Sequence, residues 1–150
     1  MIGKRTLLVA IAGAVIGGGV FAAEPEQAKP EAFKPAEPLV HIAVADAPGD
    51  GETALAAALA KRLAAAGLKE GSPHSPSIYL IEGIVEVAPA KAGRQSVRID
   101  WRVYAPDGGT LGGVSQTKLV RKGALDKKWG AAADAAARAA ADGIAKLIPR

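Results

Sequence analysis

Three carboxylates lie within seven residues, at Asp46, Asp50 and Glu52, around the turn Ala-Pro-Gly. Carboxylate oxygens at close spacing can hold a hard cation such as Ca²⁺, but this spacing lacks the alternating ligands and the downstream Glu of an EF-hand loop. The turn also lacks the Lys and the Ser or Thr that complete a phosphate-binding loop. Because a helical pattern follows directly, we expect these residues to cap a helix, with a carboxylate site as the alternative.

The two histidines, His41 and His74, have no nucleophile beside them. His41 lies within an apolar run and His74 in a loop between two prolines. No Gly-x-Ser-x-Gly motif occurs, and the absence of cysteine removes thiolate catalysis, disulfides and thiolate metal sites. These residues predict no enzymatic activity, no metal site and no cofactor.

Charged side chains alternate with apolar ones along two predicted strands, over 77–87 and 95–105. Opposite charges on neighbouring strands can pair across a sheet, although exposed pairs stabilise by only about 0 to 1 kcal/mol each. These residues form either a solvated face that binds nothing or a recognition or self-association surface on an uncovered sheet face. Its residues are Glu82, Glu86, Arg98, Asp100, Arg102 and, from the next strand, Lys118.

Hydrophobic periodicity predicts the elements that position these residues. Leu39–Ala45 is a short apolar run rich in β-branched residues, which indicates a buried strand. Over 52–66 leucine recurs every four residues, which predicts a helix that begins at Asp50 or Gly51 and ends at Gly67. These leucines are Leu55, Leu59 and Leu63.

Three strands and a second helix complete the pattern. Segments 77–87, 95–105 and 110–121 are separated by turn-forming Pro and Gly, which predicts an antiparallel meander. An alanine-rich stretch over 125–148 predicts a long helix with a small-residue face. The expected fold class is α+β with two layers: the order βαβββα, a mixed four-stranded sheet, and both helices on one face. We expect Trp101 and Trp129 in the core. The alternative for Trp129 is an exposed position where it anchors a partner protein.

The first residues follow the order of a secretory signal. Lys4 and Arg5 precede an apolar run over 6–21, and the small residues Ala22 and Ala23 come next. We expect a signal peptide over 1–22 with cleavage after Ala22, or else after Ala23. An uncleaved membrane anchor is the alternative, but the run is shorter than the roughly 20 residues of a spanning helix. No cysteine is present to carry a lipid.

Residues 23–38 contain a proline every few positions and charges of both signs, which predicts a disordered linker before a domain over 39–148. The net charge of the whole chain is +4, and Lys4 and Arg5 of the leader contribute two of these charges. This balance does not indicate nucleic-acid binding.

Several segments carry a resemblance to known proteins: Ala47–Leu55, Tyr79–Val85, Gln95–Trp101, Gly113–Gln116 and Trp129-Gly130 before the Ala-rich stretch. The pattern is similar to a group of small exported bacterial proteins, many of them lipoproteins. More loosely, the βαβββα order resembles accessory domains of the TolB amino-terminal, penicillin-binding-protein activator and curli-secretion lipoprotein type. This resemblance implies binding to an envelope partner rather than catalysis.

Together these features predict a non-enzymatic periplasmic accessory domain that acts through contacts with an envelope protein. A homo-oligomer through the sheet face is compatible with the same surface, and membrane contact is expected only if the leader is retained. Two alternatives stay open. One is a small-ligand carrier or enzyme with an unrecognised carboxylate site, and the other is a membrane-tethered structural module with an uncleaved leader.

Overall fold

The computed structural model describes residues 37–150, and Glu37–Arg150 form one compact unit. The expected signal peptide, with its cleavage positions Ala22 and Ala23, and nearly all of the expected linker lie outside the described residues. Within the described unit, neither helix combines the length and the apolar character needed to cross a membrane.

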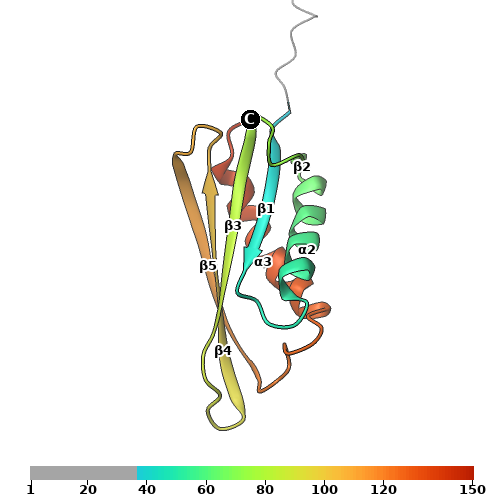
Figure 1. The fold of residues 1–150 in the computed structure, drawn as a ribbon, viewed down its shortest axis with the longest axis vertical. Coiled ribbons are helices and arrows are strands. Elements are labelled where there is room, and N and C mark those ends of the chain that lie inside the picture. Colours follow the sequence, from blue (N-terminus) through green and yellow to red (C-terminus); the bar gives the residue numbers. More distant parts are fainter. Residues whose placement is uncertain (1–36) are drawn as a thin grey trace, which may run out of the picture. The chain divides into compact units, whose positions relative to one another are not determined.

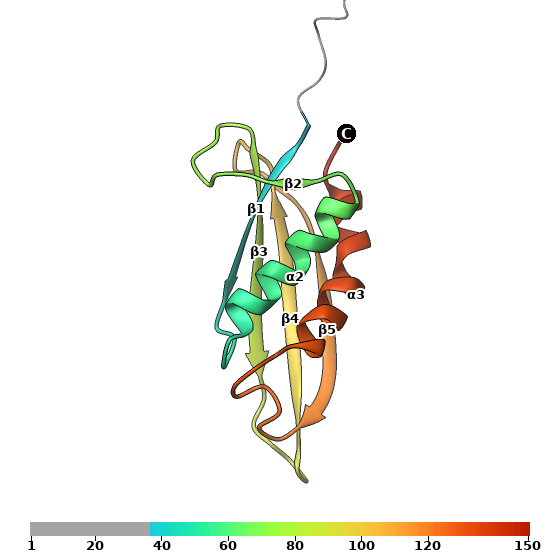
Figure 2. The same ribbon diagram turned by 90° about the vertical axis from the view of Figure 1, so that its right-hand side faces the viewer.

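The unit is a two-layer α+β domain, with a mixed sheet on one side and both helices on the other (Figures 1 and 2). The strand order is β2-β1-β3-β4-β5, in which β1 runs parallel to β2 and β3, and β3, β4 and β5 are antiparallel neighbours. The two layers and the placement of both helices on one face confirm the predicted class. The elements are β1 (Leu39–Ala45), α2 (Gly51–Ala65), β2 (Lys69–Glu70), β3 (Ile78–Val87), β4 (Arg94–Tyr104), β5 (Thr110–Arg121) and α3 (Ala131–Leu147).

The sheet has five strands rather than the four predicted. The additional strand, β2, is only two residues long and pairs with β1 through Leu39 opposite Lys69 and Val40 opposite Glu70. Both of its side chains are exposed, so it leaves no hydrophobic period in the sequence. Only the arrival of the chain beside β1 creates this strand.

The second helix is shorter than predicted, because it begins at Ala131 rather than near Leu125. Gly130 has a φ of 42°, which lies in the left-handed region and is incompatible with a continuous right-handed helix. Trp129, just before it, is buried in the core, as predicted, but from the segment that leads into the helix. Alanine content alone does not show where this helix begins.

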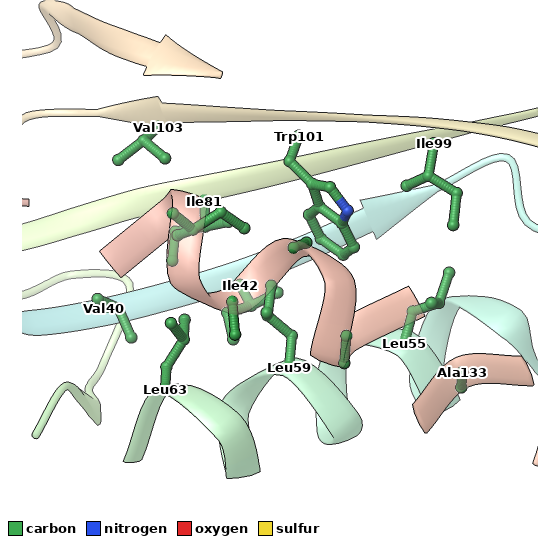
Figure 3. Packing of buried hydrophobic residues seen from close by; sticks show 14 of the residues in the cluster. Val40, Ile42, Leu55, Leu59, Leu63, Ile81, Ile99, Trp101, Val103 and Ala133 are labelled. Carbon is green, nitrogen blue, oxygen red and sulfur yellow. The ribbon is translucent and has the colours of Figure 1, made fainter. Parts of the chain in front are cut away.

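The core lies between the helices and the inner face of the sheet. Figure 3 shows the Trp101 indole beside Ile81 and Ile99, facing the leucines of α2. Trp101 is 1% exposed, and its indole N–H has no acceptor within 37–150, so packing alone holds the side chain there. The fully buried residues are Val40, Leu55, Leu59, Leu63, Leu68, Ile81, Val103, Ala137, Ala140 and Ile144.

Gly83 makes room for this indole. The residue faces Trp101 across the β3–β4 pair, and a Cβ added at Gly83 would lie 2.5 Å from the Cζ3 atom of the indole. A contact this short forces either the ring or the strand to move. One of the two core tryptophans therefore depends on a glycine in the neighbouring strand.

Trp129 ties the beginnings of both helices together. Its indole Nε1 donates to the carbonyl oxygen of Pro48 at 2.8 Å, and its backbone N–H donates to Asp50 Oδ1 at 2.8 Å. The backbone N–H of Asp50 in turn donates to the carbonyl oxygen of Lys127 at 2.8 Å. Asp50 does occupy the N-cap position of α2, as predicted, but its carboxylate makes no cap bond to its own helix. It binds the chain entering α3 instead.

Replacing Gly83 with Ala should destabilise the fold by about 1 to 3 kcal/mol, because the added methyl group overpacks the core against Trp101. Urea denaturation of the two proteins measures this difference. Glu86→Ala, on the exposed side of the same strand, serves as the control and should change the free energy of unfolding by no more than about 0.5 kcal/mol. Equal midpoints for Gly83→Ala and the unmodified protein would contradict the packing described.

Candidate functional site

The face of the sheet opposite the helices carries five of the six predicted surface residues. On this face Glu82 lies opposite Arg102, and Glu86 lies opposite Arg98. These positions agree with the alternation of charged and apolar residues read from the sequence. Neither opposed pair is an ion pair, however. Within 37–150, the ion pair on this face joins Arg98 Nε and Asp100 Oδ2 at 2.9 Å, along a single strand.

Lys118 does not belong to this face, contrary to the prediction. It lies opposite Val97, whose side chain points into the core, so Lys118 projects on the helix side of β5. There it lines a groove of about 310 Å³ between β5 and α3, together with Trp129. The β4–β5 register shifts between Val103 and Tyr104, and β5 alternates too weakly in hydrophobicity for its faces to be assigned from sequence.

Asp100 is the charged group on this face with the most contacts. The hydroxyl of Ser115 on β5 donates to Asp100 Oδ1 at 2.5 Å, while Arg98 contacts the other carboxylate oxygen. The Ser115 hydrogen bond first, and then Arg98 and the charge of Arg102, hold the pKa of Asp100 below its ordinary value, although partial desolvation opposes them. Asp100 is therefore a fixed anion that binds β4 to β5.

A hollow of about 450 Å³ lies beside the charged residues on the same face. Its floor comes from β1, β3 and β4, and its rim from the loops that precede β3 and follow β4. His41, Leu80 and Tyr104 are half-buried there. The lining residues are His41, Pro73, Ile78, Leu80, Glu82, Tyr104, Ala105, Pro106 and Gly108.

The sequence of β3 indicates this hollow, although the alternation of charged and apolar residues did not predict it. The first half of β3 is apolar on both faces, since Ile78 and Leu80 alternate with the core-facing Tyr79 and Ile81. Apolar residues on both sides are typical of a strand that is covered on both sides. In the structure the outer side has no covering element among the described residues, which leaves Ile78 and Leu80 half-buried.

The acidic turn at 46–52 is occupied by contacts within the fold. The backbone N–H of Asp46 donates to Glu52 Oε1 at 3.1 Å, and the Asp50 carboxylate accepts from Trp129. Within 37–150, no three His, Asp or Glu side chains lie close enough together to hold a metal ion. His41 lines the hollow, whereas the backbone N–H of His74 donates to Ser72 Oγ in an exposed loop.

No family model matches the chain, and no curated protein matches it. Among solved structures, the chain is similar to a PelC dodecamer from Paraburkholderia phytofirmans, with a TM-score of 0.48, 13% identity, and coverage of 77% of this chain and 89% of that chain. Lipoprotein GNA1162 from Neisseria meningitidis has a TM-score of 0.42 and 15% identity, with coverage of 75% and 99%. A minor lipoprotein from Acinetobacter baumannii has a TM-score of 0.36 and 11% identity, with coverage of 73% and 87%. Likeness at this level assigns no function to the chain.

The lowered pKa of Asp100 predicts a loss of stability in acid. Because folding depresses this pKa, the stabilisation is complete above the unfolded-state pKa and is lost as the pH falls through the folded value. Ser115→Ala removes the largest cause of the shift, so its free energy of unfolding should fall less steeply below about pH 4. Urea denaturation over a pH series measures this slope. Thr117→Ala is the control, because Thr117 is exposed on the same strand and Ser115 is the residue of β5 that donates to the Asp100 carboxylate. Identical slopes for Ser115→Ala and the unmodified protein would contradict the assignment.

Proposed function

We propose that this protein is a non-enzymatic binding domain of the bacterial envelope that contacts a partner protein through the open face of its sheet. The proposal depends on one observation: charged side chains without ion pairs and an apolar hollow lie on the same uncovered face of the sheet. Glu82, Glu86 and Arg102 make no ion pair within 37–150, and Glu82 also lines the apolar hollow on the same face. The proposal rests on this face and on the leader sequence, and not on the distant structural neighbours.

The chemistry of the face defines the partner. Protein interfaces combine a desolvated apolar centre with a polar rim, and charges at the rim select orientation and partner more than they add affinity. The hollow would accept an apolar or aromatic side chain against Leu80 and Tyr104. Charged groups of both signs would then align with Glu82 and Arg102, which lie opposite each other in the register.

A small apolar ligand in the hollow is the second candidate, because the volume of about 450 Å³ falls in the range of small-molecule sites. The polar groups available to orient such a ligand are His41, Glu82 and Tyr104. The carboxylates of the acidic turn do not support this candidate, since Asp50 and Glu52 both accept hydrogen bonds from the backbone.

Site-specific photocrosslinking in cells tests the protein-binding proposal. A photoreactive residue at Ile84, which is exposed on the open face, should capture a partner that one at Ala135, on α3, does not. Glu82→Arg and Arg102→Glu should each reduce capture at Ile84, because each removes a charge that faces the partner. Lys61→Glu on α2 is the control and should leave capture unchanged.

The double exchange Glu82→Arg with Arg102→Glu separates recognition from stability. It restores opposite charges across the two strands, so it should recover the stability of the fold while capture stays low. If capture is the same in the unmodified protein and in all the charge variants, the open face is not the binding surface. The proposal is then wrong.

Intact-mass measurement of the protein recovered from bacterial cells separates an exported domain from a membrane-tethered module. We expect a mature chain that begins at Ala23, because Val20-Phe21-Ala22 has the small residues that a signal peptidase requires. A chain that still contains Met1 would contradict cleavage and favour the tethered module. Lys61→Gln, an exposed position on α2 that leaves the leader unchanged, serves as a control for processing and should yield the same N-terminus.

A further inference from the structure

Six basic side chains gather at one end of the domain, and we call this group the basic tip. They come from the β3–β4 hairpin and from the chain that leaves β5 toward α3, and all six are exposed. Within segments 88–94 and 121–128, which supply them, the only acidic residue is Asp126, and Asp50 at the start of α2 lies beside Lys127. The residues of the basic tip are Lys91, Arg94, Arg121, Lys122, Lys127 and Lys128.

Backbone contacts hold these segments together. Arg94 lies opposite Arg121 in the β4–β5 register, and the backbone N–H of Lys122 donates to the carbonyl oxygen of Gly93 at 3.0 Å. The side chain of Gln95 adds a further link, because its Oε1 accepts from the backbone N–H of Gly123 at 2.8 Å. The backbone positions of Arg94, Arg121 and Lys122 are therefore fixed before any ligand arrives.

The tip forms the end of the domain farthest from the start of β1. Both views show the β3–β4 hairpin projecting beyond the helices, with the chain from β5 to α3 beside it (Figures 1 and 2). Small apolar residues at Pro89, Ala90 and Ala92 form the exposed end of this hairpin. The tip thus presents a convex, basic surface with small apolar groups at its end.

No ion pair neutralises this charge within 37–150, where the two ion pairs are Lys69–Glu37 and Arg98–Asp100. Arg94 and Arg121 are also like charges directly opposite each other, an arrangement that destabilises a sheet. An anionic partner that contacts both arginines would remove the repulsion.

We propose that the basic tip docks on an anionic phospholipid surface. Clusters of about four to eight Lys and Arg at a membrane surface recognise anionic headgroups, and the tip gathers its six from segments that meet at one end. The hairpin projects beyond the helices, so a flat surface can reach the tip without meeting the rest of the domain. Nucleic acid fits less well, because segments 88–94 and 121–128 contain no aromatic side chain on which a base could stack.

This inference is independent of the open-face proposal, since the tip lies at the end of the sheet and uses none of Glu82, Arg102 or the hollow. It also changes the expectation about membranes. Contact with lipid was expected only through a retained leader, whereas the tip supplies a contact within the folded domain. A cleaved protein could then bind an open-face partner while its tip rests on the membrane.

A single reporter dye on the full chain tests the proposal, because the protein has no cysteine of its own. The dye is placed at Ala92→Cys on the tip or, as the control, at His74→Cys in the loop before β3. We expect the tip dye to report contact with phosphatidylcholine vesicles that contain about 30 mol% phosphatidylglycerol, and not with pure phosphatidylcholine. The His74→Cys dye should not respond, and salt should abolish the response at the tip.

Charge variants carrying the tip dye complete the test. Arg94→Gln with Arg121→Gln and Lys122→Gln should weaken vesicle binding at least about tenfold. The matched set Lys61→Gln, Arg138→Gln and Lys146→Gln removes the same charge elsewhere and should change binding less than about twofold. Arg121→Gln alone should raise the melting temperature while it weakens binding, a combination that misfolding cannot produce.

Four outcomes would overturn the proposal. These are an equal dye response on pure phosphatidylcholine, an equal response at both dye positions, undiminished binding by the tip variant, and an equal response to soluble polyphosphate. The last outcome would assign the tip to a soluble polyanion instead. None of the four bears on the photocrosslinking result, so the two proposals can fail separately.

Discussion

The hydrogen bond from the Trp129 indole to the Pro48 carbonyl, with the Asp50 contacts around it, fixes the positions of both helices. Pro48 and Asp50 precede α2, while Lys127 and Trp129 precede α3. The two helix beginnings are therefore joined at one point, on the side of the sheet that both helices cover. The buried indole supplies apolar area to the core and satisfies its N–H at the same time, which the indole of Trp101 does not.

This joining makes the domain asymmetric, and the asymmetry creates both proposed surfaces. One face of the sheet is covered by helices, so the other is left to solvent with its charged residues and its hollow. The chain between Arg121 and Trp129 crosses from the end of β5 to the contact between Trp129 and Pro48 at the beginning of α2. That path carries Lys122, Lys127 and Lys128 to the end where the β3–β4 hairpin presents Lys91 and Arg94.

The spacing of apolar residues along the chain predicted the helices and strands that bury one side against the core. The bounds of β1 and β5 and the buried leucines of α2 agree with the prediction, because alternation and a four-residue repeat reflect which side chains meet the core. The errors arise where tertiary contacts decide. β2 exists only because β1 lies beside it, and α3 starts late because Trp129 turns toward Pro48.

For the candidate surface, the sequence by itself determined that Glu82, Glu86, Arg98, Asp100 and Arg102 share one side of their strands, because side chains alternate along any strand. Only the tertiary structure decided that this side is open, that Lys118 lies on the other, and that Arg94 meets Arg121. The physical reason is that alternation is a property of each strand alone. Register, helix placement and the gathering of charge from segments far apart in the chain come from packing, which no local spacing records.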